Sequence, residues 1–276
     1  MTSQSRTALR DGGSIPQVGL GVFQTPQNIT CEVVKTALRA GYRHVDTAAI
    51  YENEIGVGEG IRASNIARND IFVTTKLWND DQGYDSTLRA CEESLRRLKV
   101  DTIDLYLIHW PSPHRHRYVD TWKALVRLRQ EGRAQSIWVS NFEPEHLDRI
   151  IGETGTTPVL NQIELHPRFQ QRKLRDVHAK LGIATESWSP LGQGTLVSDP
   201  TIAAIAAKHR RTPAQILIRW HVDNNLIVIP KSVTPSRIHE NIDIFGFALD
   251  DDDLANIARL DAADGRIGPN PMTARF

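Results

Sequence analysis

Short apolar runs alternate with longer segments of helical periodicity along most of the chain. Eight of the runs have the length and composition of buried parallel strands, at residues 18–22, 44–48, 71–77, 105–109, 136–140, 159–163, 184–187 and 226–229. Eight amphipathic segments predict helices, at residues 31–40, 56–64, 86–98, 118–131, 144–153, 172–181, 213–223 and 235–241. Strand–helix units repeated eight times, with no linker between them, favour a single α/β domain over residues 1–276, folded as a (β/α)8 TIM barrel.

An open doubly wound sheet is the alternative architecture. That fold binds dinucleotides through a Gly-x-Gly-x-x-Gly turn that joins its first strand to its first helix. Here Gly19 and Gly21 precede Val22 and Phe23, and no glycine-opened helix follows them. The sequence therefore favours the closed barrel.

The two ends of the chain lie outside the repeat. Residues 7–15, around Asp11-Gly12-Gly13, predict a β-hairpin that closes the floor of the barrel. Residues 249–260 predict a terminal helix, in which the acids at 250–253 complement the dipole of the first turn. Residues 265–276 predict a loop that could lie over the barrel mouth.

The charge of the chain is balanced, with 33 basic and 33 acidic residues. No overall field favours nucleic acid or a membrane, so the expected partner is a small molecule. Cys31 and Cys91 fall on predicted helices without metal-ligand spacing, which indicates unpaired thiols in a reducing compartment. The N-terminus has no signal-peptide pattern, and no run approaches the roughly 18 apolar residues of a membrane helix. We expect a cytoplasmic monomer without a bound metal.

Three ionisable residues lie at the ends of predicted strands. Asp46, Lys76 and His109 each close an apolar run, and Tyr51 follows Asp46 by five residues. A charged group beside a buried strand is costly unless it has a partner or a function. The C-terminal strand ends of a barrel converge on its catalytic rim, so we expect these four residues to share one pocket.

The four residue types suit the delivery of a proton to a carbonyl oxygen. A tyrosine hydroxyl has an ordinary pKa of about 10, and a nearby ammonium such as that of Lys76 lowers that pKa. Asp46 would neutralise the buried ammonium, and His109 would orient the carbonyl. No side chain supplies a hydride, so a nicotinamide cofactor is implied.

Each of these residues also has an ordinary explanation when it is considered alone. A strand-end lysine can be a solvated rim charge, an aspartate a helix cap and a histidine a packing residue. Lys76 could also form a Schiff base in a lyase, as strand-end lysines do in other barrels. That reading leaves Tyr51 unexplained, so the reductase interpretation accounts for more of the pattern.

The chain resembles the aldo-keto reductase family. The segments that carry the resemblance follow one another in order, at residues 41–54, 57–58, 76–78, 107–111, 139–141, 161–162 and 229–232. Together they extend from about residue 15 to residue 261, which is nearly the whole chain. Residues 161–167 and 186–194 make it most similar to the bacterial 2,5-diketo-gluconate reductase type.

The resemblance implies a role for each matching residue. Tyr51 would be the general acid, Lys76 and Asp46 would tune it, and His109 would orient the carbonyl. The implied cofactor is NADPH. Its nicotinamide end would be held by Ser140, Asn141 and Gln162 at the carboxamide and by Trp188 on the ring, and its pyrophosphate by Leu191, Gly192, Gln193 and Gly194. Its adenosine end would be held by Lys231, Ser232, Val233 and Arg237 at the 2′-phosphate and by Glu240 and Asn241 at adenine. Hydroxyl and amide groups suit a carboxamide, and cations where a loop opens a helix suit a phosphate.

The substrate pocket is expected beside the proposed acid. Its wall would contain Phe23, Ile50, Trp78, Asn79, His109 and Trp110. The predicted reaction is the NADPH-dependent reduction of small aldehydes and ketones, dicarbonyls or keto-sugars to alcohols. Three loops would set the choice of substrate: residues 79–85, residues 112–118 and the tail. The alternative function is a non-catalytic, NADPH-binding regulatory barrel.

Overall fold

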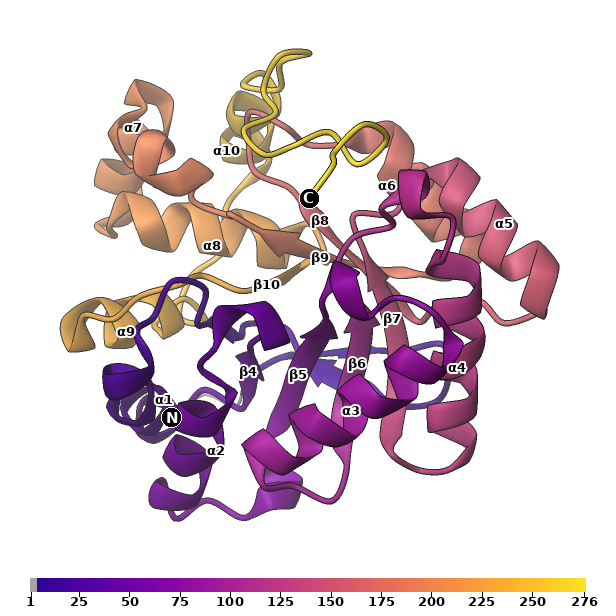
Figure 1. The fold of residues 1–276 in the computed structure, drawn as a ribbon. Coiled ribbons are helices and arrows are strands. Elements are labelled where there is room, and N and C mark those ends of the chain that lie inside the picture. Colours follow the sequence, from indigo (N-terminus) through magenta and orange to yellow (C-terminus); the bar gives the residue numbers. More distant parts are fainter. Residues whose placement is uncertain (1–3) are drawn as a thin grey trace.

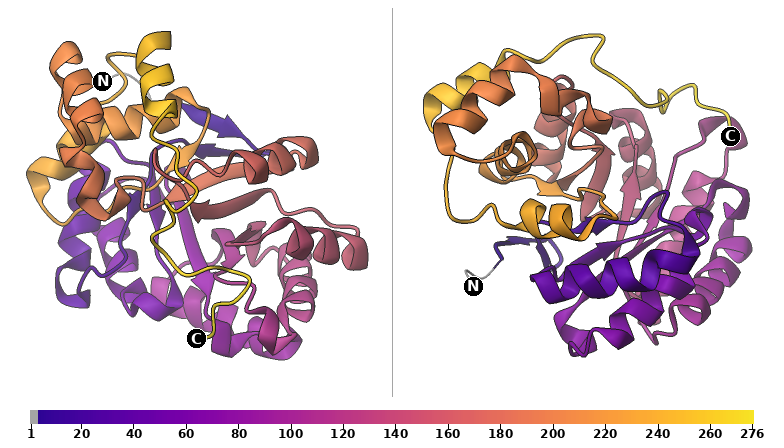
Figure 2. Two further views of the ribbon diagram at one scale, coloured as in Figure 1. Left: turned by 90° about the horizontal axis from the view of Figure 1, so that it is seen from above. Right: turned by 90° about the vertical axis from the view of Figure 1, so that its left-hand side faces the viewer.

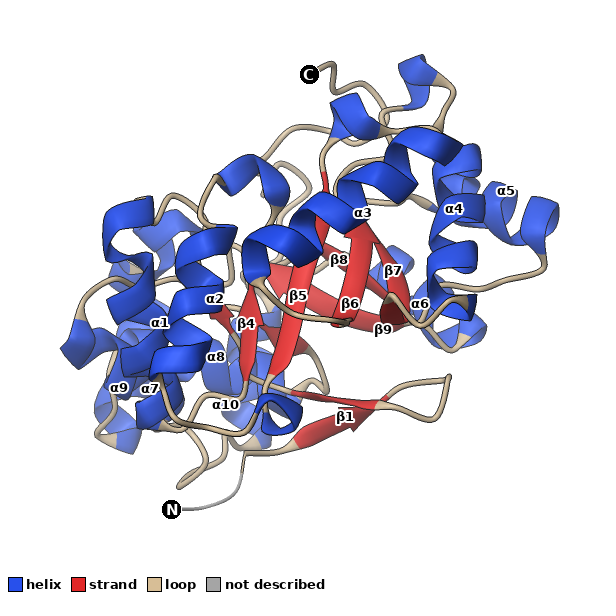
Figure 3. Cartoon of the chain, turned by 60° about the horizontal axis from the view of Figure 1, so that its bottom comes forward, coloured by secondary structure: helices blue, strands red, loops and turns tan. Residues whose placement is uncertain are grey.

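The computed structural model describes residues 4–276, which form a closed parallel barrel (Figures 1 and 3). The strands lie in the order β10-β9-β8-β7-β6-β5-β4-β3. Their bounds are Leu20–Gly21 (β3), His44–Asp46 (β4), Phe72–Leu77 (β5), Ile103–Ile108 (β6), Ala134–Ser140 (β7), Leu160–Glu164 (β8), Ala184–Trp188 (β9) and Ile227–Val228 (β10). Parallel bridges join Val18 to Val228 and Gly21 to Lys231, so the first strand segment meets the last. The predicted (β/α)8 barrel is confirmed.

Helices surround the sheet, and most of them lie where the sequence predicts (Figure 1). They are α1 (Gln27–Ala40), α2 (Glu54–Ala63), α3 (Tyr84–Leu98), α4 (Tyr118–Gln130), α5 (Pro144–Thr154), α6 (Arg172–Leu181), α7 (Pro200–His209), α8 (Pro213–Asp223), α9 (Pro235–Ile242) and α10 (Asp251–Ala258). None of them is both long and apolar enough to cross a bilayer.

Helix α7 is the one α-helix that our sequence analysis missed. It is inserted between β9 and α8, outside the simple strand–helix repeat that guided the analysis. Its start nevertheless carries a local signal, because Asp199 accepts a hydrogen bond from the backbone N–H of Thr201 and Pro200 occupies the first turn. A search for capping residues alone would have found it.

The predicted N-terminal hairpin is present and seals the bottom of the barrel (Figure 3). Strand β1 (Arg6–Ala8) pairs antiparallel with β2 (Ser14–Pro16). Leu9 and Ile15 are buried in one cluster with barrel residues such as Leu105 and Trp138. The hairpin therefore closes the end of the barrel opposite the C-terminal strand ends, where Asp46, Lys76 and His109 lie.

The terminal helix and the tail also follow the prediction. The Asp250 side chain accepts a hydrogen bond from the backbone N–H of Asp253, which confirms a capping role for the acidic run. Beyond α10, the tail passes across the strand ends when the barrel is seen from above (Figure 2). It therefore lies over the barrel mouth.

Close packing of helix α2 requires glycine at one position. A Cβ atom on Gly58 would lie 2.1 Å from the backbone oxygen of Leu98, at the end of α3. We predict that Gly58→Ala lowers the free energy of unfolding by about 1–3 kcal/mol, because either the helix or the Leu98 backbone must move. Urea denaturation would measure the change.

Gly152 provides the matched control. It lies in α5, and apart from its chain neighbours and the backbone of its own helix, no atom lies within 4 Å of the Cβ that alanine would add there. Gly152→Ala should therefore raise stability by up to about 1 kcal/mol, as expected from helix propensity. Equal effects of the two substitutions would contradict the close approach of α2 to α3.

Candidate active site

The C-terminal ends of β4 and β5 bring a buried ion pair together. Lys76 Nζ donates to Asp46 Oδ1 at 2.5 Å and to the backbone oxygen of Thr47 at 2.8 Å. The two side chains are 0% and 3% exposed, so water does not screen the pair. Adjacent strands in register hold these residues, because Asp46 pairs with Thr74 and Lys76 follows two residues later.

Tyr51 stands beside the ion pair on a short 3-10 turn (Ala49–Tyr51). Its ring centroid lies 5.2 Å from Lys76 Nζ. The loop that carries it is tethered by buried Asn53, which accepts from Thr47 Oγ1 at 2.6 Å and donates to the backbone oxygen of Val22 at 2.9 Å. The position of Tyr51 thus depends on polar contacts inside the loop as well as on the strands.

His109 completes the predicted group of four at the end of β6. Its ring meets the Tyr51 ring edge-on, with 5.7 Å between centroids. Burial, together with the charge of Lys76, holds the pKa of His109 well below its usual range. The imidazole is therefore neutral at neutral pH, and one ring nitrogen can donate a hydrogen bond.

The pKa of Tyr51 differs from the expectation. Burial raises the pKa of Tyr51 above its ordinary value, and the ammonium of Lys76 opposes this only in part. The pKa of Lys76 is itself raised, because the attraction of Asp46 and Tyr51 outweighs the effect of burial. Tyr51 therefore carries its proton, and Lys76 its charge, at neutral pH.

The polar residues expected at the nicotinamide lie together beside the four. Asn141 follows β7 with a φ of 62°, a left-handed conformation that asparagine tolerates better than most residues. Its amide nitrogen donates to Ser140 Oγ and to the backbone oxygen of His109, both at 3.0 Å. Its amide oxygen accepts from Trp188 Nε1 at 2.8 Å, which fixes the indole.

Gln162 connects this polar group to the ion pair. Its amide nitrogen donates to Asp46 Oδ2 at 2.9 Å and to Glu186 Oε2 at 2.8 Å. Glu186 lies on β9, is fully buried and was missed by our sequence analysis. Its neighbours Thr185 and Ser187 are polar, so the apolar pattern that pointed to Asp46 gives no comparable signal for Glu186.

The residues expected at the adenosine end follow β10. Lys231 and Arg237 flank the start of α9, and neither forms an ion pair within residues 4–276. Ser232 Oγ accepts from the backbone N–H of Thr234 at 3.2 Å. Val233 is exposed, Asn241 is buried, and Glu240 accepts from Thr212 Oγ1 at 2.7 Å. Two cations without carboxylate partners leave this corner free to receive an anion.

The loop after β9 contains the residues expected at the pyrophosphate. Leu191 precedes a 3-10 segment (Gly192–Ser198) in which the backbone turns sharply. Gly192, Gln193 and Gly194 all have positive φ values, of 56°, 52° and 92°. Such a turn exposes backbone N–H groups, which suits a pyrophosphate.

The residues expected to form the substrate wall differ in their exposure. Phe23 and Ile50 are exposed at the mouth, by 54% and 42%, and Phe23 lies 5.0 Å from Tyr51 between ring centroids. Trp78 lies against His109, with 5.3 Å between ring centroids. Asn79 is 1% exposed, so its amide is buried.

Phe276, in the tail, lies against two residues of the expected wall, although the sequence analysis did not name it. It stacks on Trp78 at 6.0 Å and meets Trp110 edge-on at 5.0 Å. Arg115 holds it, donating to the Phe276 backbone oxygen at 3.1 Å while it pairs with Asp80 at 2.7 Å. The tail and the loop at residues 112–118 therefore form one cover over the aromatic side of the mouth.

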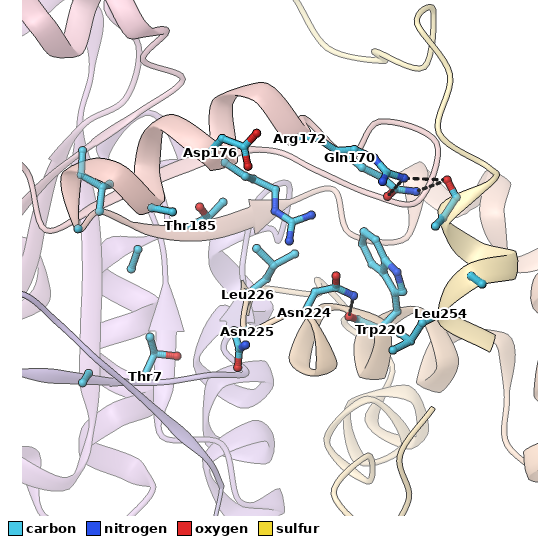
Figure 4. Close-up of a pocket in the computed structure, with 18 residues that line it drawn as sticks. Thr7, Gln170, Arg172, Asp176, Thr185, Trp220, Asn224, Asn225, Leu226 and Leu254 are labelled. Carbon is cyan, nitrogen blue, oxygen red and sulfur yellow. Dashed lines mark hydrogen bonds between the residues drawn. The ribbon is translucent and has the colours of Figure 1, made fainter. Parts of the chain in front are cut away.

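A separate cavity of about 880 Å³ lies away from these residues (Figure 4). It is lined by α6, α8 and α10, together with Thr7 of the hairpin. Thr185 and Leu226 line it at the N-terminal ends of their strand segments, opposite the four candidate residues. The candidate active site is thus at the other end of the barrel.

The buried ion pair makes a thermodynamic prediction. Lys76→Met leaves Asp46 as an uncompensated buried anion, so the free energy of unfolding should fall by roughly 3–5 kcal/mol. The double variant Asp46→Asn with Lys76→Met removes both charges and should lose clearly less. Urea denaturation of Lys76→Met, Asp46→Asn and the double variant would test this, and a double variant whose loss equals the sum of the two single losses would contradict it.

Comparisons with known proteins agree with this geometry. A model of the Aldo/keto reductase family matches residues 17–262. An aldo-keto reductase of Mycolicibacterium smegmatis is 59% identical over 271 residues, which are 98% of each chain. Methylglyoxal reductase DkgA of Escherichia coli strain K12 is 50% identical over 273 residues, again 98% of each chain.

Solved structures match equally well. The crystal structure of a Gox0644 mutant in complex with NADPH superposes with a TM-score of 0.96 at 58% identity, covering 99% of this chain and 100% of that chain. The match to the family over most of the chain, the sequence identity and the shared barrel lead to one conclusion: the protein belongs to the aldo/keto reductase family.

Proposed function

We propose that this protein is an NADPH-dependent carbonyl reductase in which Tyr51 protonates the oxygen of an aldehyde or ketone. The observation that carries the proposal is the position of Lys76 Nζ, bonded to Asp46 at 2.5 Å and 5.2 Å from the centroid of the Tyr51 ring. A buried ammonium beside a phenol has an evident chemical use, because it stabilises the phenolate left after proton transfer. The regulatory alternative has no comparable support.

The residues of the site divide the reaction between them. NADPH, when bound, supplies the hydride that reaches the carbonyl carbon. The Tyr51 hydroxyl gives its proton to the carbonyl oxygen, so the product is an alcohol and the tyrosine becomes a phenolate that solvent reprotonates. The Lys76 ammonium stabilises this phenolate, and neutral His109 donates a hydrogen bond to the same carbonyl oxygen.

The raised pKa of Tyr51 fits the direction of reduction. A general acid must hold its proton at the working pH and lose it in the transition state. Burial secures the first requirement, and the Lys76 charge eases the second. Because the ammonium has a raised pKa, it remains charged over the pH range in which the reaction would run.

The residues beside the four fit a bound dinucleotide. The Gln162 amide oxygen receives no hydrogen bond from residues 4–276, so it is available to a carboxamide N–H. Trp188 offers a flat face, held in place by Asn141, for the nicotinamide ring. Lys231, Ser232 and Arg237, with the Val233 backbone, would hold the 2′-phosphate. Glu240 and Asn241 would lie at adenine, and residues 191–194 at the pyrophosphate.

The cover over the mouth favours a small substrate. Phe276, Trp78 and Trp110 surround the aromatic side, and Phe23 and Ile50 border the opening. We infer that the preferred substrates are small aldehydes and α-dicarbonyls of the size of methylglyoxal, the compound named for the Escherichia coli relative. Larger keto-sugars would require the tail to move.

Replacing the proposed acid tests the mechanism. Tyr51→Phe removes the transferable proton and keeps the ring, so kcat for methylglyoxal reduction should fall by about 10²–10⁴-fold. NADPH binding, measured by fluorescence titration, should remain close to that of the wild type. Tyr106→Phe is the matched control and should keep full activity, because the Tyr106 hydroxyl is buried in the main core cluster and has no hydrogen-bond partner among residues 4–276. If Tyr51→Phe keeps wild-type activity, another group supplies the proton.

Cofactor choice is tested at the free cations. Lys231→Ala with Arg237→Ala removes two charge-assisted contacts, so the Kd for NADPH should rise by roughly 10²-fold or more while that for NADH changes little. Lys173→Ala with Lys180→Ala, both exposed on α6, removes the same total charge elsewhere. Equal losses for NADPH and NADH would contradict the 2′-phosphate role.

A further inference from the structure

Glu186 is an interior carboxyl that the mechanism above does not use. It lies on β9, where it pairs in register with Gln162 of β8 and Ile227 of β10. Its exposure is 0%, and its Oε2 accepts from the Gln162 amide at 2.8 Å. Its Oε1 has no hydrogen-bond partner among residues 4–276.

The charged groups around Glu186 do not balance if it is ionised. The neighbouring cation is Lys76, which already pairs with Asp46 at 2.5 Å. From β4, His44 Nε2 lies 3.9 Å from Glu186 Oε1, but burial lowers the pKa of His44 to about 3, so the ring is neutral. Tyr51 is protonated, and β10 contributes only Ile227 and Val228. One cation would therefore face two buried anions.

An unpaired buried carboxylate is unfavourable, and the alternative is to keep the proton. Burial and the nearby Asp46 charge raise the pKa of Glu186 to about 8. Its unfolded value is 4.5, so the folded protein holds a proton across a range in which the unfolded chain does not. The carboxyl is thus neutral at neutral pH and ionises in mildly alkaline solution.

The position of Glu186 also determines how the Gln162 amide is turned. Both amide N–H groups point at carboxyl oxygens, one at Asp46 and one at Glu186. Turning the amide over would point its oxygen at the Asp46 carboxylate, which is repulsive. The amide oxygen is left to face any ligand beside Ser140 and Asn141.

We propose that Glu186 is a positioning residue that fixes the Gln162 amide for the nicotinamide carboxamide and, when it ionises, makes the site favour the oxidised cofactor. The proposal rests on the proposed function, because it requires a nicotinamide at Gln162. The oxidised ring carries a positive charge that the reduced ring lacks. A new anion next to Gln162 therefore attracts NADP⁺ but not NADPH.

The test uses Glu186→Gln, which keeps the size of the side chain and cannot ionise. In the wild type, the ratio of NADP⁺ to NADPH affinity, from fluorescence titration, should rise several-fold between about pH 6.5 and about pH 9.5. In Glu186→Gln the ratio should stay nearly constant. Glu59→Gln, at an exposed position of α2, is the matched control and should behave like the wild type. An equal pH dependence in the wild type and Glu186→Gln overturns the proposal.

A second readout does not involve the cofactor or catalysis. Between pH 4.5 and about 8 the unfolded chain releases the Glu186 proton while the folded protein retains it, so wild-type stability falls as pH rises. The Tm of Glu186→Gln should therefore exceed the wild-type Tm by a margin that grows up to about pH 8 and is constant above it. A margin that does not change with pH shows that Glu186 is ionised throughout, which overturns the neutral state.

Infrared spectroscopy gives a measurement on the wild type itself, should Glu186→Gln fail to fold. A protonated carboxyl band present near pH 7 should disappear with a midpoint near pH 8, and its absence at pH 7 would overturn the proposal. The experiments on Glu186 can fail independently of the experiments on the proposed reductase function. An inactive enzyme that shows both the Glu186 titration and the shift in cofactor preference would refute carbonyl reduction alone.

Discussion

The ion pair between Lys76 and Asp46 is the interaction on which the rest of the site depends. Both groups are withdrawn from water, so either charge alone would destabilise the fold. Parallel neighbouring strands hold the pair in register, and the loop tethered by Asn53 brings Tyr51 to it. The barrel thus places a cation that water cannot screen next to the phenol that we propose as the proton donor.

The other polar groups are arranged around this charge. Lys76 helps to keep His109 neutral, which leaves the imidazole as a hydrogen-bond donor. Gln162 donates to Asp46 and to Glu186, so the amide that we propose for the cofactor is linked to the same ion pair. The groups that we propose for proton delivery and for cofactor orientation therefore belong to one buried polar cluster, whose residues come from the five strands β4, β5, β6, β8 and β9.

Most strands of the barrel, and several residues at their ends, could be predicted because each strand has a local sequence pattern. An apolar run that closes on Asp46, Lys76 or His109 identifies both the strand and the rim to which it points. The hairpin and the acidic cap of α10 carry equally local signals. These features do not depend on which distant segments come together.

The features that escaped prediction are those set by distant contacts or by competing energies. Phe276 reaches Trp78 and Trp110 from the far end of the chain, where Arg115 bonds to its backbone. Burial raises the pKa of Tyr51 more than the ammonium of Lys76 lowers it. The sequence indicates both effects but does not show which of them is larger. Glu186 is one polar residue of a strand in the sequence, and its contact with Gln162 exists only in the folded barrel.

The most direct measurement of proton delivery uses fluorinated tyrosines of graded acidity at position 51. If Tyr51 is the acid beside a charged Lys76, the alkaline limb of the pH–rate profile for carbonyl reduction will move to lower pH as the phenol becomes more acidic. The displacement will match the change in phenol pKa along the series. An alkaline limb that stays at the same pH for every analogue would show that the proton comes from another group.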